Sequence, residues 1–258
     1  GAKISYVKWD MNRHMSDAYS PCLSNQGEFA HRYIIGLYEV LDRVFTPRRH
    51  ILFESCSSGG NRFDLGMLCY SPQIWASDDT DPIERLDIQS GLSYLYPQST
   101  VGAHVSAAPH QQTLRDTPLS TRFNVAAFGV LGYELELKYM THAELKELRG
   151  QIEFYKAHRK TFQFGRFYRF DERKDNKVHW QVSSRDGKEH IVGHFQKLCT
   201  ASEGPDALCV HDLDSKAKYH LSCKRQSLFI KRLGGLVKHV MPIELDPDGL
   251  IPVSYTHL

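Results

Sequence analysis

Charged and apolar side chains alternate near the start of the sequence in a way that could support chemistry. In the run YVKWDMN, Tyr6, Lys8 and Asp10 share one face if the run is a β-strand, and Asn12 joins them if the chain stays extended. Lys8 beside Asp10 favours the ionised carboxylate, because an opposite charge at short range stabilises it. A fixed carboxylate can act as a nucleophile. A surface ion pair at a strand end would explain the same residues.

A second group of acids lies in the run IWASDDTDPIERL. Carboxylates close together raise one another's pKa, so one of them can stay protonated and serve as a general acid. Asp81 followed by Pro82 is also typical of a helix N-cap with a first-turn proline, which would make Asp81 structural. Asp78 and Asp79 precede that cap and are the better candidates for chemistry. The spacing lacks the glycine and the terminal glutamate of an EF-hand calcium loop.

A glycine-rich loop, ESCSSGGNRFD, lies between these two groups in the sequence. Gly59 and Gly60 would let the backbone approach a ligand closely. The small side chains of Cys56 and Ser58 would suit a ligand rich in hydroxyl groups. The loop lacks the lysine and Ser/Thr ending of a phosphate-binding P-loop. A tight turn would explain these glycines equally well.

Three expected strands, residues 4–9, 50–55 and 73–77, must place these polar groups. Apolar residues at three- and four-residue spacing predict a helix over 27–45, and further helical segments are expected near 64–70 and after Asp81. A fourth strand is expected at 99–106. Alternating strands and helices predict a parallel sheet, whose carboxyl ends share one edge. Two carboxylates facing each other there would suggest glycoside hydrolysis.

The second part of the chain has a different pattern. Residues 122–137 are strand-like at one end and helical in the middle, and a T-x-x-E capping box at Thr141 and Glu144 predicts the start of a helix. After about residue 161, short strand-like runs such as VHWQVSS, EHIVGHFQKL and YHLSC alternate with polar turns, which predicts an antiparallel β domain. We therefore expect an α/β region over residues 1–160 and an all-β region over residues 161–258.

Bulk composition excludes several classes of protein. The chain has 258 residues, 41% of them hydrophobic and 24% charged, and its net charge of +2 gives no reason to expect a nucleic-acid or membrane partner. No apolar run is long enough to span a bilayer, and no signal peptide is visible. Six cysteines without a CxxC pair indicate a reducing, cytoplasmic compartment rather than a zinc ribbon. Because the first residue is not Met and begins a strand-like run, we expect a fragment.

Five segments in order, KWDMNR, ESCSSGGNRFDLGM, WASDDTDPIERL, VGAHVS and FNVAAFGVLGYELEL, resemble the motif series of glycoside hydrolase family 36, the bacterial-type α-galactosidases. They cover roughly residues 3–140. The resemblance implies a partial (β/α)8 barrel, about strands four to eight, followed by a small antiparallel β-sandwich domain. Strands one to three and the family's N-terminal β domain would be absent, so the chain alone is expected to be inactive. The last residues, VSYTHL, match no family motif and are expected to be a non-native end.

The resemblance also implies roles for single residues. Asp10 takes the position of the nucleophile and Asp78 that of the acid/base, with Asp79 as the fallback. The family's galactose-recognition positions correspond, with differing strength, to Lys8, Asn12, Cys56, Ser58, Gly59, Arg62 and Asp79. The family loop is often richer in glycine, so Ser58 and Asn61 are departures. No metal and no organic cofactor is expected.

The implied activity is retaining hydrolysis of terminal α-galactosyl residues, as in melibiose and raffinose. The full-length enzyme is expected to be a homo-oligomer, a tetramer by family resemblance. Three alternatives remain open: a raffinose-synthase-type α-galactosyl transferase, an α-N-acetylgalactosaminidase on the same scaffold, and a non-catalytic galactose-binding protein.

Overall fold

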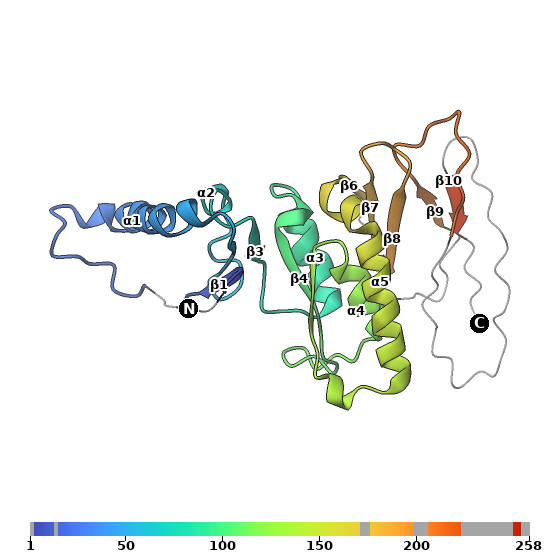
Figure 1. Ribbon diagram of the computed structural model, residues 1–258, viewed down its shortest axis with the longest axis horizontal. Helices are drawn as coiled ribbons and strands as arrows, with labels where there is room; N and C mark the ends of the chain where they lie inside the picture. The colour runs from blue at the N-terminus through green and yellow to red at the C-terminus, as the bar shows by residue number, and fades with distance from the viewer. Residues whose placement is uncertain (1–2, 13–14, 171–175, 199–205, 223–249, 254–258) are drawn as a thin grey trace. The chain divides into compact units, whose positions relative to one another are not determined.

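The computed structural model describes residues 3–12, 15–170, 176–198, 206–222 and 250–253 (Figure 1). The chain divides into two compact units. The first comprises residues 1–116 and 126–136, and the second comprises residues 117–125 and 137–258. The first unit contains one sheet and the second contains two, and each unit is described separately below.

The first unit is built on a five-stranded parallel sheet. Its strands are β1 (Tyr6–Asp10), β2 (Leu52–Cys56), β3 (Gln73–Trp75), β4 (Val101–Ser106) and β5 (Val130–Glu134), in that spatial order. The helical elements along the same stretch are η1 (Gln26–Glu28), α1 (Phe29–Phe45), η2 (Thr46–Arg48), α2 (Leu65–Leu68), α3 (Pro82–Leu92) and η3 (Gln98–Thr100).

Each strand pairs with the next one along the chain, and within the described residues β1 pairs only with β2 and β5 only with β4. Sequential parallel strands joined by helical crossovers form half of a (β/α)8-type barrel. The expected parallel α/β arrangement is therefore confirmed. The assignment of these strands as numbers four to eight of a complete barrel stays a prediction.

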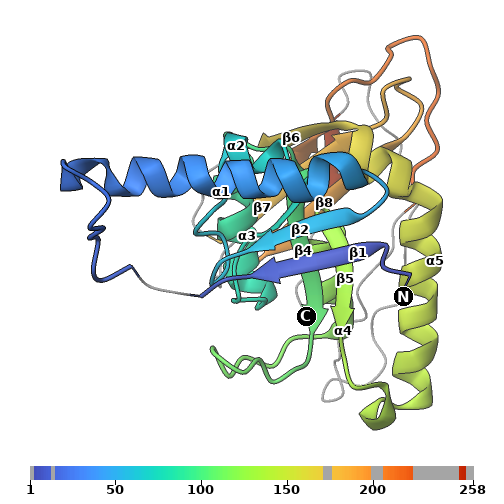
Figure 2. The same ribbon diagram turned by 60° about the vertical axis from the view of Figure 1, so that its left-hand side comes forward.

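The face of the sheet that lies under α1 carries the apolar core of the first unit (Figure 2). Leu37 and Leu41, one helical turn apart on α1, are buried against Phe53 of β2. Val7 and Trp9 of β1 pack against the same cluster. Tyr6, Lys8 and Asp10 therefore point to the opposite face, as the alternation along the strand predicted.

The segment 122–137, ambiguous in sequence, contains the end of one helix and a strand. Helix α4 covers Leu119–Ala126 and strand β5 covers Val130–Glu134, so the helix comes first. The pattern was misleading because β5 carries no strict alternation and its residues are only half-buried. The strand expected at 73–77 is also shorter than predicted, since β3 ends at Trp75 and residues 76–81 form a turn.

The second unit contains η4 (Leu137–Tyr139), a long helix α5 (His142–Phe164), and a three-stranded antiparallel sheet of β6 (Arg166–Phe170), β7 (Lys177–Ser183) and β8 (His190–Gln196). A separate antiparallel pair joins β9 (Asp206–Cys209) to β10 (Leu250–Val253). The strand expected at 219–223 is absent from its described part, because residues 219–222 are irregular. The expected boundary at residue 160 lies inside α5 and stays a prediction. Residues 254–258 of the expected non-native end lie outside the described residues.

The capping box at the start of α5 is present as predicted. The Thr141 hydroxyl accepts a hydrogen bond from the Glu144 amide at 3.2 Å, and the Glu144 carboxylate accepts one from the Thr141 amide at 2.8 Å. These bonds, made mainly to the carboxylate form, hold the pKa of Glu144 below its usual value.

The loop after β2 lies directly on the backbone that follows β3. Gly59 has φ of 77°, in the left-handed region that favours glycine. A Cβ atom at Gly59 would lie 3.0 Å from the Ser77 Cα, and one at Gly60 would lie 2.6 Å from the Ala76 carbonyl oxygen. The two glycines therefore let the two turns touch through their main chains.

We expect Gly60→Ala to destabilise the chain by about 1–3 kcal/mol, because the added methyl group meets backbone that must move. Gly36→Ala, within α1, is the matched control: a Cβ there has nothing within 4 Å, so this change should stabilise the helix by roughly 0.5–1 kcal/mol. Urea unfolding of both variants measures the difference. Equal effects of the two substitutions would show that the glycine contact is unimportant.

Candidate active site

Four of the expected site residues meet where β1 and β2 end. The Asn12 amide donates a hydrogen bond to the Asp10 carboxylate at 3.3 Å. The Asn12 carbonyl oxygen accepts hydrogen bonds from Ser58, from its amide at 2.7 Å and from its hydroxyl at 3.0 Å. Cys56 is the cross-strand partner of Asp10, and its thiol is close enough to the Asp10 carboxylate to be influenced by its charge. The first expected acid thus lies in a network with Asn12, Cys56 and Ser58.

The Cys56 thiol is a neutral hydrogen-bond donor near pH 7. Burial, together with the neighbouring Asp10 carboxylate, raises the pKa of Cys56 to about 11. Asp10 itself is exposed. The Asn12 amide and the neighbouring Cys56 thiol restrict the orientation of this exposed carboxylate.

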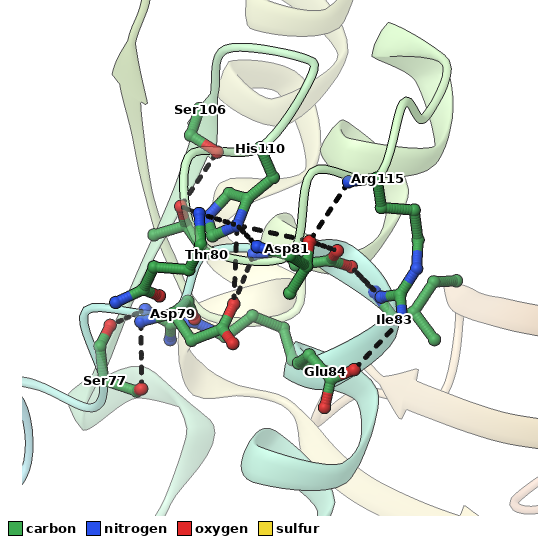
Figure 3. Close-up of polar contacts among 12 residues, drawn as sticks. Ser77, Asp79, Thr80, Asp81, Ile83, Glu84, Ser106, His110 and Arg115 are labelled. Atoms are coloured by element: carbon green, nitrogen blue, oxygen red, sulfur yellow. Dashed lines mark hydrogen bonds and ion pairs between the residues drawn. The ribbon is translucent and has the colours of Figure 1, made fainter.

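The second expected acid lies in the turn between β3 and α3, part of which Figure 3 shows. The Trp75 indole N–H donates a hydrogen bond to Asp78 Oδ1 at 2.8 Å. Asp79 is folded into the turn instead: its Oδ1 accepts from the Asp81 amide at 3.0 Å, and its own amide donates to the Ser77 hydroxyl at 3.1 Å. Asp78 is exposed, whereas Asp79 is partly buried. Of the two acids, Asp78 is the more open to a ligand.

Asp81 is the helix N-cap that the sequence suggested. Its carboxylate accepts a hydrogen bond from the Ile83 amide at 2.8 Å, forms an ion pair with Arg115 at 2.7 Å and accepts a further bond from the Thr113 hydroxyl. Although burial acts to raise the pKa of Asp81, these contacts hold it below its usual value. Asp81 is fully buried and therefore structural.

Side chains outside the expected set hold this turn in place (Figure 3). The Thr80 hydroxyl lies 2.8 Å from the Ser106 hydroxyl and 3.0 Å from His110 Nε2. The buried guanidinium of Arg85 donates to the carbonyl oxygens of Ser77, Asp79 and Gly102 at 2.6–3.0 Å. Burial lowers the pKa of Arg85 to about 10, which still leaves it charged at neutral pH. Sequence reasoning missed Arg85 and His110, because Arg85 binds backbone carbonyl oxygens and His110 contacts Thr80, which is distant in the sequence.

A row of polar side chains crosses the sheet on the face opposite to α1. Lys8 forms an ion pair with Glu54 at 3.4 Å, and its ammonium group lies 4.5 Å from the centre of the Trp75 ring. Trp75 also packs on His104, with ring centres 4.4 Å apart, and His104 pairs with Glu134 at 2.6 Å. Burial lowers the pKa of His104. Glu54, His104 and Glu134 were not predicted, although a charged residue within an apolar strand is a usable signal.

The row connects the two expected acids. Lys8 is two residues from Asp10 on the same strand face, and it contacts Trp75, which is hydrogen-bonded to Asp78. The Gly59 contact makes a second connection, because a Cβ there would lie 3.4 Å from the Asp78 amide nitrogen. Because β1, β2 and β3 are parallel neighbours, their carboxyl ends also share one edge. No described contact joins Arg62 to these residues, and its role stays a prediction.

The described part of the chain has neither a metal-binding cluster nor a membrane-spanning helix. It contains no group of three or more His, Cys, Asp or Glu side chains arranged to hold a metal ion. None of its helices combines the length and the apolar character needed to cross a lipid bilayer. Its four cysteines, Cys22, Cys56, Cys69 and Cys209, are free thiols.

Comparisons with known proteins place the chain in a family. The family model described as Melibiase matches residues 1–165, more than half of the chain, and the model of the glycosyl hydrolase family 36 C-terminal domain matches residues 177–240. The chain is 47% identical to α-galactosidase AgaA of Geobacillus stearothermophilus over 85% of its length, and 52% identical to α-galactosidase 1 of Pediococcus pentosaceus over 84%. It spans only 31% and 30% of those relatives.

Solved structures agree with this assignment. The crystal structure of the Geobacillus α-galactosidase matches 82% of this chain with a TM-score of 0.78, and that of the Lactobacillus brevis α-galactosidase matches 98% with a TM-score of 0.82 and 40% identity. The chain covers 30% and 36% of those two structures. Variants of the Geobacillus enzyme were solved in complex with raffinose and with stachyose. The chain therefore belongs to the melibiase family, the α-galactosidases of glycoside hydrolase family 36.

Proposed function

We propose that this chain carries both catalytic acids of a longer retaining α-galactosidase that hydrolyses terminal α-galactosyl residues. The observation that carries the proposal is the placement of Asp10 and Asp78 at one edge of one sheet, connected through Lys8 and Trp75. Raffinose and stachyose, bound by variants of a relative, support a raffinose-type substrate. The rest of the barrel, as strands one to three, would come from outside this chain.

The proposed reaction is a double displacement. The Asp10 carboxylate attacks the anomeric carbon while the protonated Asp78 gives its proton to the departing glycosidic oxygen, which forms a covalent galactosyl-enzyme. Asp78, now a carboxylate, then takes a proton from water as that water attacks the anomeric carbon and releases Asp10. Retention of this kind requires the two carboxyl groups to lie about 5–5.5 Å apart in the assembled site.

The surrounding contacts support these two roles. Asp10 accepts a hydrogen bond from the Asn12 amide and lies beside the Cys56 thiol, and these neighbours hold its carboxylate in one orientation for attack. The Trp75 bond to Asp78 Oδ1 orients that carboxyl group and leaves Oδ2 to carry the proton. Asp79, whose carboxylate is used within the turn, is assigned to substrate binding with Lys8, Asn12, Cys56, Ser58, Gly59 and Arg62.

The role of Asp78 as acid/base has a test that depends on the leaving group. In the full-length enzyme, Asp78→Asn should slow hydrolysis of raffinose by about 10²–10⁴-fold, because general acid assistance contributes that much. Galactosyl transfer to the enzyme from an aryl galactoside with an acidic phenol needs no proton and should be much less affected. Single-turnover release of the phenol measures this step.

Asp79→Asn and Asp10→Asn are the matched controls, since each removes one carboxylate from the same edge. Asp10→Asn should abolish turnover of both substrates. If Asp79→Asn shows the leaving-group dependence and Asp78→Asn does not, the acid/base is Asp79.

The stereochemistry of the product tests the two-step mechanism independently. Because two inversions restore the original configuration, the first galactose released from an aryl α-galactoside should be the α-anomer. Proton NMR spectra recorded before mutarotation distinguish the anomers. Initial release of β-galactose would contradict the covalent intermediate at Asp10.

A further inference from the structure

Glu54 is a buried carboxyl group for which the proposed mechanism has no use. It is 2% exposed, on the same face of the sheet as Asp10, and it is the cross-strand partner of Lys8. One oxygen, Oε2, accepts hydrogen bonds from the Tyr6 hydroxyl and from the Gln73 amide, the latter at 3.3 Å. The other, Oε1, accepts no hydrogen bond within the described residues. Burying a charge in this way destabilises a fold unless its partners compensate.

The partner of Glu54 Oε1 is the ammonium group of Lys8, 3.4 Å away. The same ammonium group lies 4.5 Å from the centre of the Trp75 ring, so it is held between a carboxylate and an aromatic face. The Lys8 side chain remains 35% exposed. An ammonium group has three donors, and it can thus offer hydrogen bonds to a ligand while it is held from behind.

A lysine without such partners would be a poor recognition group. Its flexible four-carbon stem lets the charge occupy many positions, and binding a ligand would have to fix it. Lys8 is fixed in advance by two neighbours, and one of them, Trp75, also holds Asp78. The position of the ammonium group is therefore coupled to the edge where the two acids lie.

We propose that Glu54 is a positioning residue, whose carboxylate holds the Lys8 ammonium group over the Trp75 ring so that Lys8 meets the hydroxyl groups of the galactosyl residue in one fixed geometry. The inference rests on the proposed function of the site. Glu54 acts through Lys8 and makes no contact with the reacting atoms. Its loss should therefore weaken substrate binding more than it slows the chemical step.

The charged and titratable groups that face Glu54 are Tyr6 and Lys8 from β1 and Glu134 from β5, and Glu134 is paired with His104 from β4. Burial, with a smaller effect of the Glu134 charge, raises the pKa of Glu54 to about 7. As the pH falls through about 7, Glu54 becomes neutral and releases Lys8, so the KM for an α-galactoside should rise.

The effect on stability has the opposite sign. A carboxyl group whose pKa is raised in the folded chain contributes stability at low pH, and this contribution is lost as the pH rises through about 7. Glu54→Gln keeps the size and an acceptor but removes the charge. It should therefore raise the melting temperature at pH 8 while it weakens binding. Replacing a residue with a purely structural role would instead lower the melting temperature and weaken binding together.

The experiment compares Glu54→Gln with Glu39→Gln in the full-length enzyme. Glu39 lies on α1, is 58% exposed and, among the described residues, pairs only with Arg43 one turn away, so it controls for the loss of one carboxylate. At pH 8, Glu54→Gln should raise the KM for an aryl α-galactoside about tenfold and change kcat less than threefold. In Glu54→Gln the pH dependence of KM near pH 7 should disappear. Glu39→Gln should change neither KM nor its pH dependence.

A double substitution separates the action through Lys8 from other effects. If Glu54 acts only by holding Lys8, adding Glu54→Gln to Lys8→Gln should raise KM no further. An unchanged KM, or a fall in kcat alone, would overturn the proposal. If Glu54→Gln does not fold, the pH dependence of KM in the wild-type enzyme is the test. A KM that does not change between pH 6 and 8 would then contradict the positioning role of Glu54.

Failure of the proposed function gives a different result. If the wild-type enzyme does not hydrolyse α-galactosides, that function is wrong, and crystal structures of the wild type and Glu54→Gln then test the positioning role. The Lys8 ammonium group should leave the Trp75 ring in the variant. Finding it at the same place in both structures would show that Glu54 does not position it.

Discussion

Direct contact between two stretches of main chain is the constraint on which the candidate site depends. The loop after β2 can rest on the turn after β3 only because residues 59 and 60 have no Cβ atom. Ser58, in that loop, binds Asn12 next to Asp10, while the turn beneath the loop carries Asp78. The glycine pair thus fixes the separation between the loop that binds Asn12, next to Asp10, and the turn that carries Asp78.

The two faces of the sheet differ in chemical character. Apolar side chains on one face pack under α1, and the opposite face carries a charged and aromatic row from Lys8 to Glu134. Charged side chains at these positions would destabilise the fold if they were unpaired, because buried charges need partners. Because they are paired, these groups give the edge of the sheet that carries Asp10 and Asp78 a fixed electrostatic environment.

Sequence patterns predicted the parts of this arrangement that are encoded locally. Alternation in YVKWD gave the orientation of Asp10, and Asp81-Pro82 and Thr141-x-x-Glu144 predicted two helix starts. Arg85, His110 and Glu134 could not be found this way. His110 and Glu134 have partners distant in sequence, which only the fold brings close, and Arg85 binds backbone carbonyl oxygens, which no side-chain pattern marks. Residues 122–137 were ambiguous because β5 lacks a strict period.

The pairing of β1 with β2 has a consequence for how this strand can vary. A shift of one residue would turn Asp10 toward the helix and Trp9 toward the opposite side, since neighbouring side chains occupy alternate faces. Val7 and Trp9, buried beside Phe53, oppose that shift. The apolar side chains on the back of the strand therefore keep its register, and a change at Trp9 would alter the position of the Asp10 side chain without contacting it.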